Sequence, residues 1–223
     1  MKIKRLFDTI FDFIKSIYIN FKCLPFKQAL KMPIKIKWNV HIGKLEKNCI
    51  VIKNNDIKKS MIELGYKGAK FIPENKSYFT IKNNGKMIFN GNTTIGDGFN
   101  ILIDGGLLEF GENVYINRNI QIQCENKVSF GINNLVGWNV KIRDTDGHHI
   151  YENSIKKDKD GVIKFGNHIW IASDVTILKN TEIKDNSVIA CESLICGKKF
   201  EENNVLIAGS PAKIIKRNID WEE

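Results

Sequence analysis

Apolar residues recur at every sixth position through the C-terminal part of the chain. Six consecutive blocks of six residues, from Phe165 to Phe200, each begin with an apolar residue, and four of them continue with a small or flexible one. A short fixed repeat indicates one structural unit stacked on itself, with each unit burying its apolar residue against the next. Six residues are too few for a helical hairpin and suit a short strand followed by a corner. Three such units would make one triangular coil of a parallel β-helix.

The same period appears further upstream, with shifts of phase that are typical of corners of unequal length. Clusters such as Asn90-Gly91 and Asp104-Gly105-Gly106 supply tight turns, because Gly and Asn adopt positive φ at low cost. The repeat therefore extends over roughly residues 89 to 200, which predicts an all-β fold for most of the chain. The upstream runs begin at Phe89, Phe110 and Phe130.

One polar stretch, from about Thr145 to Lys164, interrupts the repeat. A loop that leaves a regular solenoid usually does so for function. We therefore expect residues 145–164 to protrude as the one loop of a β-helix domain that spans residues 34–207. Residues 208–223 would follow this domain as a C-terminal tail.

Before the repeat, the pattern changes twice. Residues 34–42 alternate between apolar and polar, as a half-buried strand does, and residues 50–52 form a second short apolar run. Residues 53–70 are polar and rich in lysine, which indicates a loop or irregular coil.

Residues 1–33 predict an amphipathic helix and a linker. Apolar residues between Leu6 and Phe21 recur at helical spacing, and charged residues interrupt them. No apolar run approaches the roughly 20 residues of a spanning helix, and no signal-peptide cleavage site follows. Two interpretations stay open. The helix packs on its own domain or a sister subunit, or residues 1–26 lie on a membrane surface.

Composition narrows the choice of partners. The 223 residues are 43% hydrophobic, enough for a sizeable core, and the net charge of +9 favours an anionic partner. The lysines are scattered, without the aromatic interleaving of single-strand binders, so nucleic acid is not expected. The five cysteines form no CxxC pair and are read as reduced thiols in the cytoplasm, with Cys191 and Cys196 as apolar fillers of the repeat.

Three features together resemble the hexapeptide-repeat acyltransferases. They are the repeat, the segment Gly166-Asn-His-Ile-Trp-Ile-Ala-Ser173, and the end Ala208-Gly-Ser-Pro-Ala-Lys-Ile-Ile-Lys216. The family's corresponding motifs are Gly-Asp-x-Val-Trp-Ile-Gly and (A/V)-G-N-P-A-(K/R)-x-I-(K/R). Within the family, the chain looks closest to sugar O-acetyltransferases of surface polysaccharide pathways and to galactoside and maltose acetyltransferases. The resemblance implies a left-handed β-helix, acetyl-CoA as co-substrate, no metal, and a homotrimer with active sites between subunits.

The segment from Arg143 to His149 opens the predicted loop. His148 matches the family's catalytic His, and a neutral-range pKa suits an imidazole to take the proton from an attacking hydroxyl. His149 is the alternative base. A catalytic His also needs an acceptor that fixes its tautomer. Asp144 and Asp146 are the candidates, and a turn-capping role for one of them stays equally open.

The resemblance also implies residues that bind the two substrates. Asn117 and Glu125 would contact the acceptor sugar, although Cys124 replaces one of the two acids that the family often has there. The remaining residues would bind coenzyme A: Trp170, Ala172 and Ser173 would line the pantetheine arm, Cys191 and Lys198 would lie beside it, and Lys213, Lys216 and, as a third candidate, Arg217 would face the phosphates.

We therefore expect an acetyl-CoA-dependent O-acetyltransferase acting on a sugar hydroxyl. An N-acetyltransferase acting on an amino sugar nucleotide is the main alternative, since the same scaffold and His serve both. A non-catalytic solenoid would have no need of Asp-Gly-His beside a coenzyme tail. A zinc hydratase on this helix would need three ligating histidines across coils, and the chain has four in all: His41, His148, His149 and His168.

Overall fold

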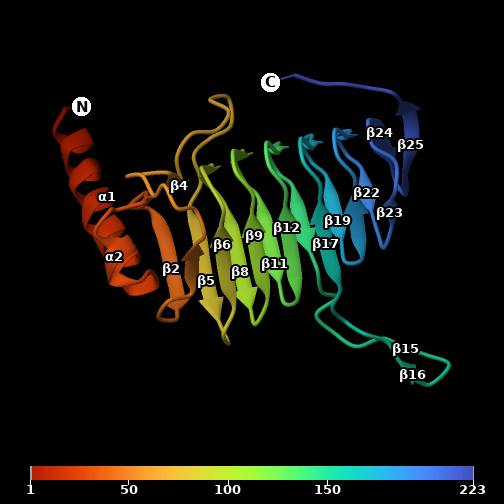
Figure 1. The fold of residues 1–223 in the computed structure, drawn as a ribbon, viewed down its shortest axis with the longest axis horizontal. Helices are drawn as coiled ribbons and strands as arrows, with labels where there is room; N and C mark the ends of the chain where they lie inside the picture. The colour runs from red at the N-terminus through yellow and green to blue at the C-terminus, as the bar shows by residue number, and fades with distance from the viewer. Residues whose placement is uncertain (1, 223) are drawn as a thin grey trace.

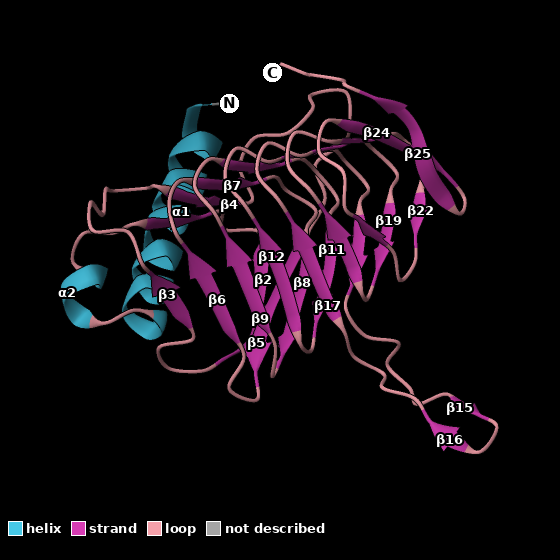
Figure 2. Ribbon diagram, turned by 45° about the vertical axis from the view of Figure 1, so that its right-hand side comes forward, coloured by secondary structure: helices cyan, strands magenta, loops and turns pink. Residues whose placement is uncertain are grey.

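Three sheets of parallel strands form the faces of a left-handed triangular solenoid (Figures 1 and 2). The computed structural model describes residues 2–222, with side chains from residue 7 onward. Sheet A contains β1 (Ile34–Ile36), β4 (Ile62–Leu64), β7 (Thr93–Ile95), β10 (Val114–Ile116), β13 (Leu135–Val136), β18 (Trp170–Ile171), β21 (Val188–Ile189), β24 (Val205–Gly209) and an antiparallel last strand, β25 (Ala212–Arg217).

The other two faces have seven strands each. Sheet B contains β2 (Val40–Leu45), β5 (Ser77–Lys82), β8 (Asn100–Asp104), β11 (Gln121–Cys124), β14 (Lys141–Arg143), β19 (Thr176–Leu178) and β22 (Leu194–Ile195). Sheet C contains β3 (Ile50–Ile52), β6 (Lys86–Phe89), β9 (Leu107–Phe110), β12 (Lys127–Phe130), β17 (Val162–Phe165), β20 (Thr181–Ile183) and β23 (Lys199–Phe200).

The predicted β-helix is confirmed, and each apolar column of the repeat lines one sheet. In sheet A, Ile171 pairs with Ile189, which pairs with Ile207, and all three are fully buried. Paired residues are three hexads apart in the sequence. Each coil therefore places its apolar residues on the same faces as the coil before it. The side chains that point inward from the three sheets form one continuous core.

Sheet C shows what this register does for packing. Phe89, Phe110, Phe130 and Phe165 pair in register, and their rings stack at centroid distances of 5.4, 5.3 and 4.8 Å. These distances are close to the spacing of about 4.8 Å between paired strands, so the backbone ladder itself sets the aromatic stack. The core is thus a set of columns that run along the solenoid axis.

Two expectations about the N-terminal half need correction. The strand expected over residues 34–42 is divided into β1 and β2 by a corner at residues 37–39. The stretch 53–70, expected to be irregular, contains β4, whose Ile62 and Leu64 are buried in the core. Short strands with only two inward residues are too brief for a polar, lysine-rich window to reveal.

Helix α1 (Lys2–Cys23), followed by the short α2 (Phe26–Ala29), covers the N-terminal end of the solenoid (Figures 1 and 2). It packs there with the side that carries Ser16, Ile19, Asn20 and Cys23, all of which are buried. Ser16 Oγ accepts the N–H of Ile36, and Asn20 both donates to the carbonyl and accepts from the N–H of Ile34. An edge strand presents unpaired N–H and C=O groups, and these side chains satisfy them. The helix therefore packs on its own domain through this side. These contacts leave the membrane interpretation open, because it concerns the opposite side of the helix.

Two segments leave the solenoid, where one was expected. Residues 144–161 project from the corner between sheets B and C and contain the hairpin β15 (Tyr151–Glu152) and β16 (Ile155–Lys156). Since β17 begins at Val162, the protrusion ends earlier than the expected residue 164. Residues 65–76 leave the opposite side, between sheets A and B (Figure 1).

Candidate active site

The protruding loop is held firmly where it leaves the solenoid. Thr145 and Asp160 form a β-bridge across its neck. Lys179, at the corner of the next coil, lies 2.6 Å from the carboxylate of Asp146 and 2.6 Å from the carbonyl of Asp158. The loop is therefore a pinned arm whose tip extends away from its own coils (Figure 2).

His148 lies on this arm just beyond the neck and is exposed to solvent. Within the described part of the chain, its imidazole makes no hydrogen bond and no ion pair. His149 differs, because its Nδ1 lies 3.2 Å from the carbonyl oxygen of Lys157 within the same loop. Of the two candidate bases, His148 is the one whose ring is free to meet a substrate.

Asp144 makes no hydrogen bond with His148 in the described part of the chain. Its side chain is fully buried, and its two oxygens accept the backbone N–H groups of Glu125 and Asn126 at 2.8 and 2.9 Å. Burial raises the pKa of this carboxyl, and the two N–H groups oppose the rise. These are the contacts expected of Asp144 if it caps a turn. Asp146 is likewise engaged elsewhere, with Lys179.

Glu125, expected to contact the acceptor, belongs to the same corner. One of its carboxylate oxygens accepts a hydrogen bond from the ammonium of Lys159. The other accepts a hydrogen bond from Gln123 Nε2 at 2.9 Å. The hydrogen bond to Glu125, together with one to Asp160, raises the pKa of Lys159. Glu125 thus ties the loop to the coil below it in the isolated chain.

Asn117 lies at a different corner, between sheets A and B. Its side-chain oxygen accepts the N–H of Ala69 at 2.9 Å, so it holds the segment 65–76 over the corner. The buried Arg118 assists, since it donates to the carbonyls of Ala69 and Ile72 and pairs with Asp97 at 2.6 Å. Sequence reasoning missed this segment.

Ala172, Ser173 and Cys191 share the corner of Asn117. Ala172 lies directly above Gly137 in the stack, and a Cβ on Gly137 would be only 2.7 Å from the carbonyl carbon of Ala172. Cys191 and Cys196 are exposed at corners and do not fill the core, so the expectation of apolar fillers is wrong for both. Positions at the end of a short strand point outward, which a period alone does not reveal.

Trp170 stands on the outer face of sheet A and is partly exposed. It pairs with Val188, which pairs with Leu206, which pairs with Lys216. At about 4.8 Å per strand, this row spans roughly 14 Å from the indole to the lysine. On the outer face of sheet A, this row therefore has an aromatic side chain, Trp170, at one end and a basic one, Lys216, at the other.

The C-terminal tail adds a residue that the sequence did not bring to attention. Trp221 stacks on His168 with ring centroids 4.1 Å apart, and it lies 6.0 Å from the ring of Trp170. Its indole N–H donates to the carbonyl of His168 at 3.1 Å. The tail therefore folds back along the prism after β25 (Figure 1). A lone Trp near the end of a charged tail was the only signal.

The basic residues of the tail are not equivalent. Lys213 and Lys216 are exposed on β25 and make no ion pair within the described residues. Arg217 forms a two-point ion pair with Glu202, at 2.7 and 3.0 Å, which lowers the pKa of Glu202. Lys198 Nζ approaches the carbonyl of Ala212 at 3.4 Å, beside the β24–β25 turn. The third phosphate candidate, Arg217, is thus already engaged.

The structure separates the expected site residues into two groups. The loop group, at the corner of sheets B and C, comprises His148, Asp144, Asp146 and Glu125. The sheet-A group lies on that sheet, at its corner with sheet B and on the tail: Trp170, Ala172, Ser173, Cys191, Asn117, Lys213 and Lys216. Lys198 stands at the last corner between sheets B and C, between β22 and β23. In one chain the face of sheet B lies between the two groups.

Within residues 2–222, no helix is long and apolar enough to cross a membrane. The same residues contain no group of three or more His, Cys, Asp or Glu side chains placed to hold a metal ion.

Comparison with known proteins identifies the family. No family model matches the chain. An "uncharacterized 24.8 kDa protein in cps region" of Klebsiella pneumoniae is 34% identical over 92% of this chain and 89% of its own length. The "putative lipopolysaccharide biosynthesis O-acetyl transferase WbbJ" of Escherichia coli is 30% identical over 61% of this chain and 74% of its own.

A solved structure shows the same fold. The polySia-specific acetyltransferase NeuO superposes with a TM-score of 0.60 and 21% identity, over 86% of this chain and 79% of that one. The repeat, the sheet register and the identity with WbbJ over most of its length agree. The chain belongs to the hexapeptide-repeat O-acetyltransferases that fold as left-handed β-helices.

Proposed function

We propose that the protein transfers the acetyl group of acetyl-CoA to a hydroxyl of a sugar in the biosynthesis of a bacterial surface polysaccharide, with His148 as the general base. The proposal rests on one observation above all: an exposed, unpartnered His148 on a pinned arm, in a chain of this family. The names of the relatives support the substrate class, since one concerns lipopolysaccharide biosynthesis and another a capsule-region protein.

The outer face of sheet A suits a coenzyme A molecule. Its row from Trp170 to Lys216 would lie along the thin pantetheine arm, with Trp221 as a further wall. The uncommitted ammonium groups of Lys213 and Lys216 would face the phosphates. When bound, the thioester supplies an activated acetyl group, so no metal is needed.

His148 would perform both proton transfers. Its free ring nitrogen takes the proton from the sugar hydroxyl as that oxygen forms a bond to the acetyl carbon. It returns the proton to sulfur as the carbon–sulfur bond breaks. The products are the acetyl ester and the free thiol, and the imidazole ends neutral, as it began.

A second copy of the chain would complete the site. In one chain, Asp144 and Asp146 are engaged elsewhere, and the loop group and the sheet-A group lie on different parts of the prism. We propose that the arm of one subunit reaches the donor face of its neighbour in a homotrimer. The neighbour would then provide the surroundings that orient His148.

The N-acetyltransferase alternative is not favoured, because two relatives with a named activity, WbbJ and a galactoside acetyltransferase of Escherichia coli, are named as O-acetyltransferases. The enzyme is expected in the cytoplasm, where acetyl-CoA is available.

The direct test is a mass-spectrometric screen of purified protein with acetyl-CoA and a panel of sugars, nucleotide sugars and glycan fragments. We expect a mass gain of one acetyl group on a hydroxyl-bearing sugar. His148→Ala should lower the rate by about two orders of magnitude or more. The KM for acetyl-CoA and the Tm should stay unchanged, since the side chain is exposed and makes no hydrogen bond or ion pair with the described residues.

His149→Ala is the matched control, because it removes a neighbouring imidazole that is engaged with Lys157. We expect it to retain most of the activity. Near-full activity of His148→Ala would refute the assignment of the base, and acetylation of amines alone would refute the O-acetyl proposal.

A further inference from the structure

Helix α1 is amphipathic, and its apolar side faces away from the protein. Eight large apolar side chains between Phe7 and Phe21 are exposed, with exposures from 38% at Ile17 to 56% at Phe7. On the opposite side, the polar Ser16 and Asn20 are almost fully buried, together with only two apolar residues among the described side chains of α1, Ile19 and Cys23. This is the reverse of a surface helix in a globular protein, which buries its apolar stripe.

The end of the solenoid explains the reversal. The first coil offers unpaired backbone groups, and α1 meets them with polar side chains. Asp12 accepts the N–H of Trp38 at 2.6 Å, and Lys15 donates to the carbonyls of Trp38 and Val40. The same contacts that cap the coil require the apolar side of α1 to point outward.

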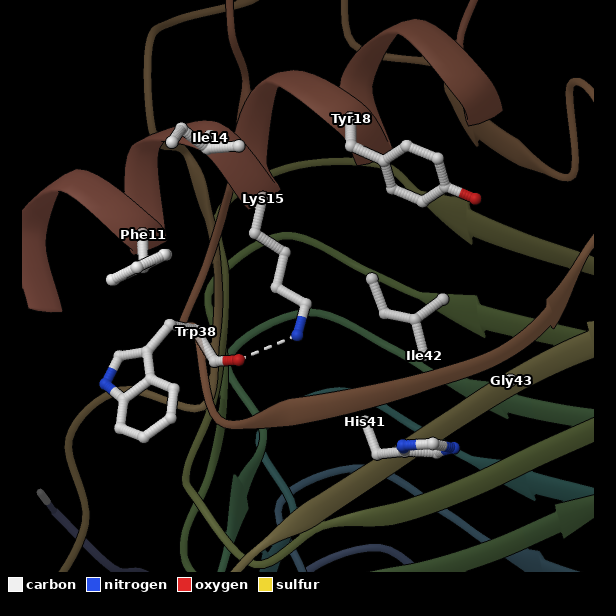
Figure 3. Close-up of a pocket in the computed structure, with 8 residues that line it drawn as sticks. All are labelled: Phe11, Ile14, Lys15, Tyr18, Trp38, His41, Ile42 and Gly43. Atoms are coloured by element: carbon white, nitrogen blue, oxygen red, sulfur yellow. Dashed lines mark hydrogen bonds between the residues drawn. The ribbon is translucent and has the colours of Figure 1, made fainter.

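The exposed apolar surface continues beyond α1. Phe26 of α2 is 67% exposed, packs edge-to-face on Phe21 at 5.9 Å, and is followed by the exposed Leu30. At the other margin, Phe11, Ile14 and Tyr18 line an open cavity of about 540 Å³ together with Trp38 (Figure 3). Exposed apolar patches of this extent mark binding surfaces.

Charges border this surface, and they are basic. Lys22, Lys27 and Lys31 lie at its C-terminal end and make no ion pair within the described side chains. In the sequence, Lys2, Lys4 and Arg5 occupy the first turn of α1, although their side chains lie outside the described part. The acids of α1 lie on the inner side: Asp12 binds Tyr66 and Trp38, and Asp8 is one turn earlier on the same side.

This charge pattern distinguishes between two possible partners of the exposed apolar surface, a second copy of the chain and a lipid bilayer. A second copy laid against α1 would bring basic ends together in either orientation, and each chain has a net charge of +9. An anionic bilayer surface complements both ends at once and accepts the aromatic side chains between them. The helix has too many charges to span a membrane, which leaves the interfacial position.

We propose that the outer face of α1 and α2, from Phe7 to Leu30, binds the surface of a bilayer that contains anionic lipids. The helices lie flat in the headgroup region with their apolar side chains inserted, and the solenoid stands on this end. This inference does not depend on the acyl-transfer proposal. It rests on the exposure of the apolar face, the contacts that fix its direction and the flanking lysines.

The test is flotation of the full-length protein with vesicles of phosphatidylcholine alone or mixed with phosphatidylglycerol. We expect binding to the anionic vesicles, weaker binding to the neutral ones, and release as salt rises. Phe11→Ser with Ile14→Ser should weaken binding at least about tenfold. Lys27→Glu with Lys31→Glu should weaken it on anionic vesicles only.

Two controls keep the result interpretable. Ile132→Ser removes an equally exposed apolar residue far from α1 and should not alter binding. The Tm of the α1 variant should match the wild type, because both replaced side chains face outward. Absence of wild-type binding to anionic vesicles would overturn the proposal. So would unchanged binding of the α1 variant, or an α1-dependent oligomer that forms without any lipid binding.

Discussion

Asp144 and His148 are four residues apart, yet the fold gives them opposite surroundings. Asp144 is fully buried with both oxygens occupied by backbone N–H groups, whereas His148 is exposed and without a partner in the described chain. A carboxylate in such a position ties the start of the arm to the turn at residues 125–126 of the preceding coil. At the scale of single residues, one residue builds the site and the other is available for chemistry.

Replacing Asp144 separates these two roles. Asp144→Ala leaves two partly buried N–H groups without their acceptors and should lower the free energy of unfolding by about 2 kcal/mol. Asp144→Asn keeps one acceptor oxygen and should cost less. Urea unfolding measures both values. An unchanged midpoint for Asp144→Ala, combined with a large loss of kcat, would show that the residue acts in catalysis and not as a cap.

The basic residues of β25 provide a second contrast. If Lys213 faces a phosphate of the donor, Lys213→Ala should raise the KM for acetyl-CoA about tenfold and alter kcat much less. Arg217→Ala is the control, because Arg217 is paired with Glu202 and should leave this KM nearly unchanged. Steady-state kinetics with varied acetyl-CoA decides the matter, and equal effects of the two variants would contradict the assignment.

At the scale of elements, α1 shows how one requirement overrides another. Hydrophobic burial alone would turn the apolar side of the helix inward. The open end of a β-helix instead presents backbone groups that need partners, and unpaired buried N–H and C=O groups are costly. Ser16 and Asn20 supply these partners, so the helix keeps its polar side against the coil.

This arrangement makes a prediction that is opposite to the usual one for a surface helix. Asn20→Ala should destabilise the protein by about 2 kcal/mol, since it strands the N–H and the carbonyl of Ile34. Ile17→Ala, on the outer side of the same helix, should change stability little. Thermal unfolding of the two variants at equal concentration compares them directly. A larger loss for Ile17→Ala would mean that the apolar side is covered in solution.

At the scale of the whole molecule, the two groups of site residues lie on different parts of one prism. The pinned arm holds His148 away from its own coils, and the aromatic and basic row lies on sheet A. In a single chain, therefore, the two parts of the proposed site do not meet. Assembly of copies around a common axis would bring an arm to a neighbour's donor face.

Mixed assemblies test this arrangement. His148→Ala and Trp170→Ala should each be nearly inactive alone. When the two variants are co-expressed and copurified with different tags, hybrid oligomers should recover measurable activity, because one intact arm can meet one intact donor face. Light scattering gives the oligomeric state of each preparation. A stable wild-type monomer with full activity would contradict the shared site.

The sequence by itself determined the solenoid, its apolar columns and the position of the main loop, and it supplied the candidates for the site. These follow from local rules, since a hexad states which side chain points inward without reference to distant residues. Only the tertiary structure decided which polar groups are occupied. Lys179 against Asp146, Asn117 against Ala69 and Trp221 against His168 join positions far apart in the chain.

Which side of α1 faces the protein was likewise decided only by the tertiary structure. Its period predicts an amphipathic helix, but an amphipathic pattern does not say which side meets the protein. The unpaired backbone of the first coil decides that, and those groups come from residues 34–40, which pair with no earlier strand. Periodicity reveals the shape of each element, whereas the partners of its polar groups appear only when the coils are stacked.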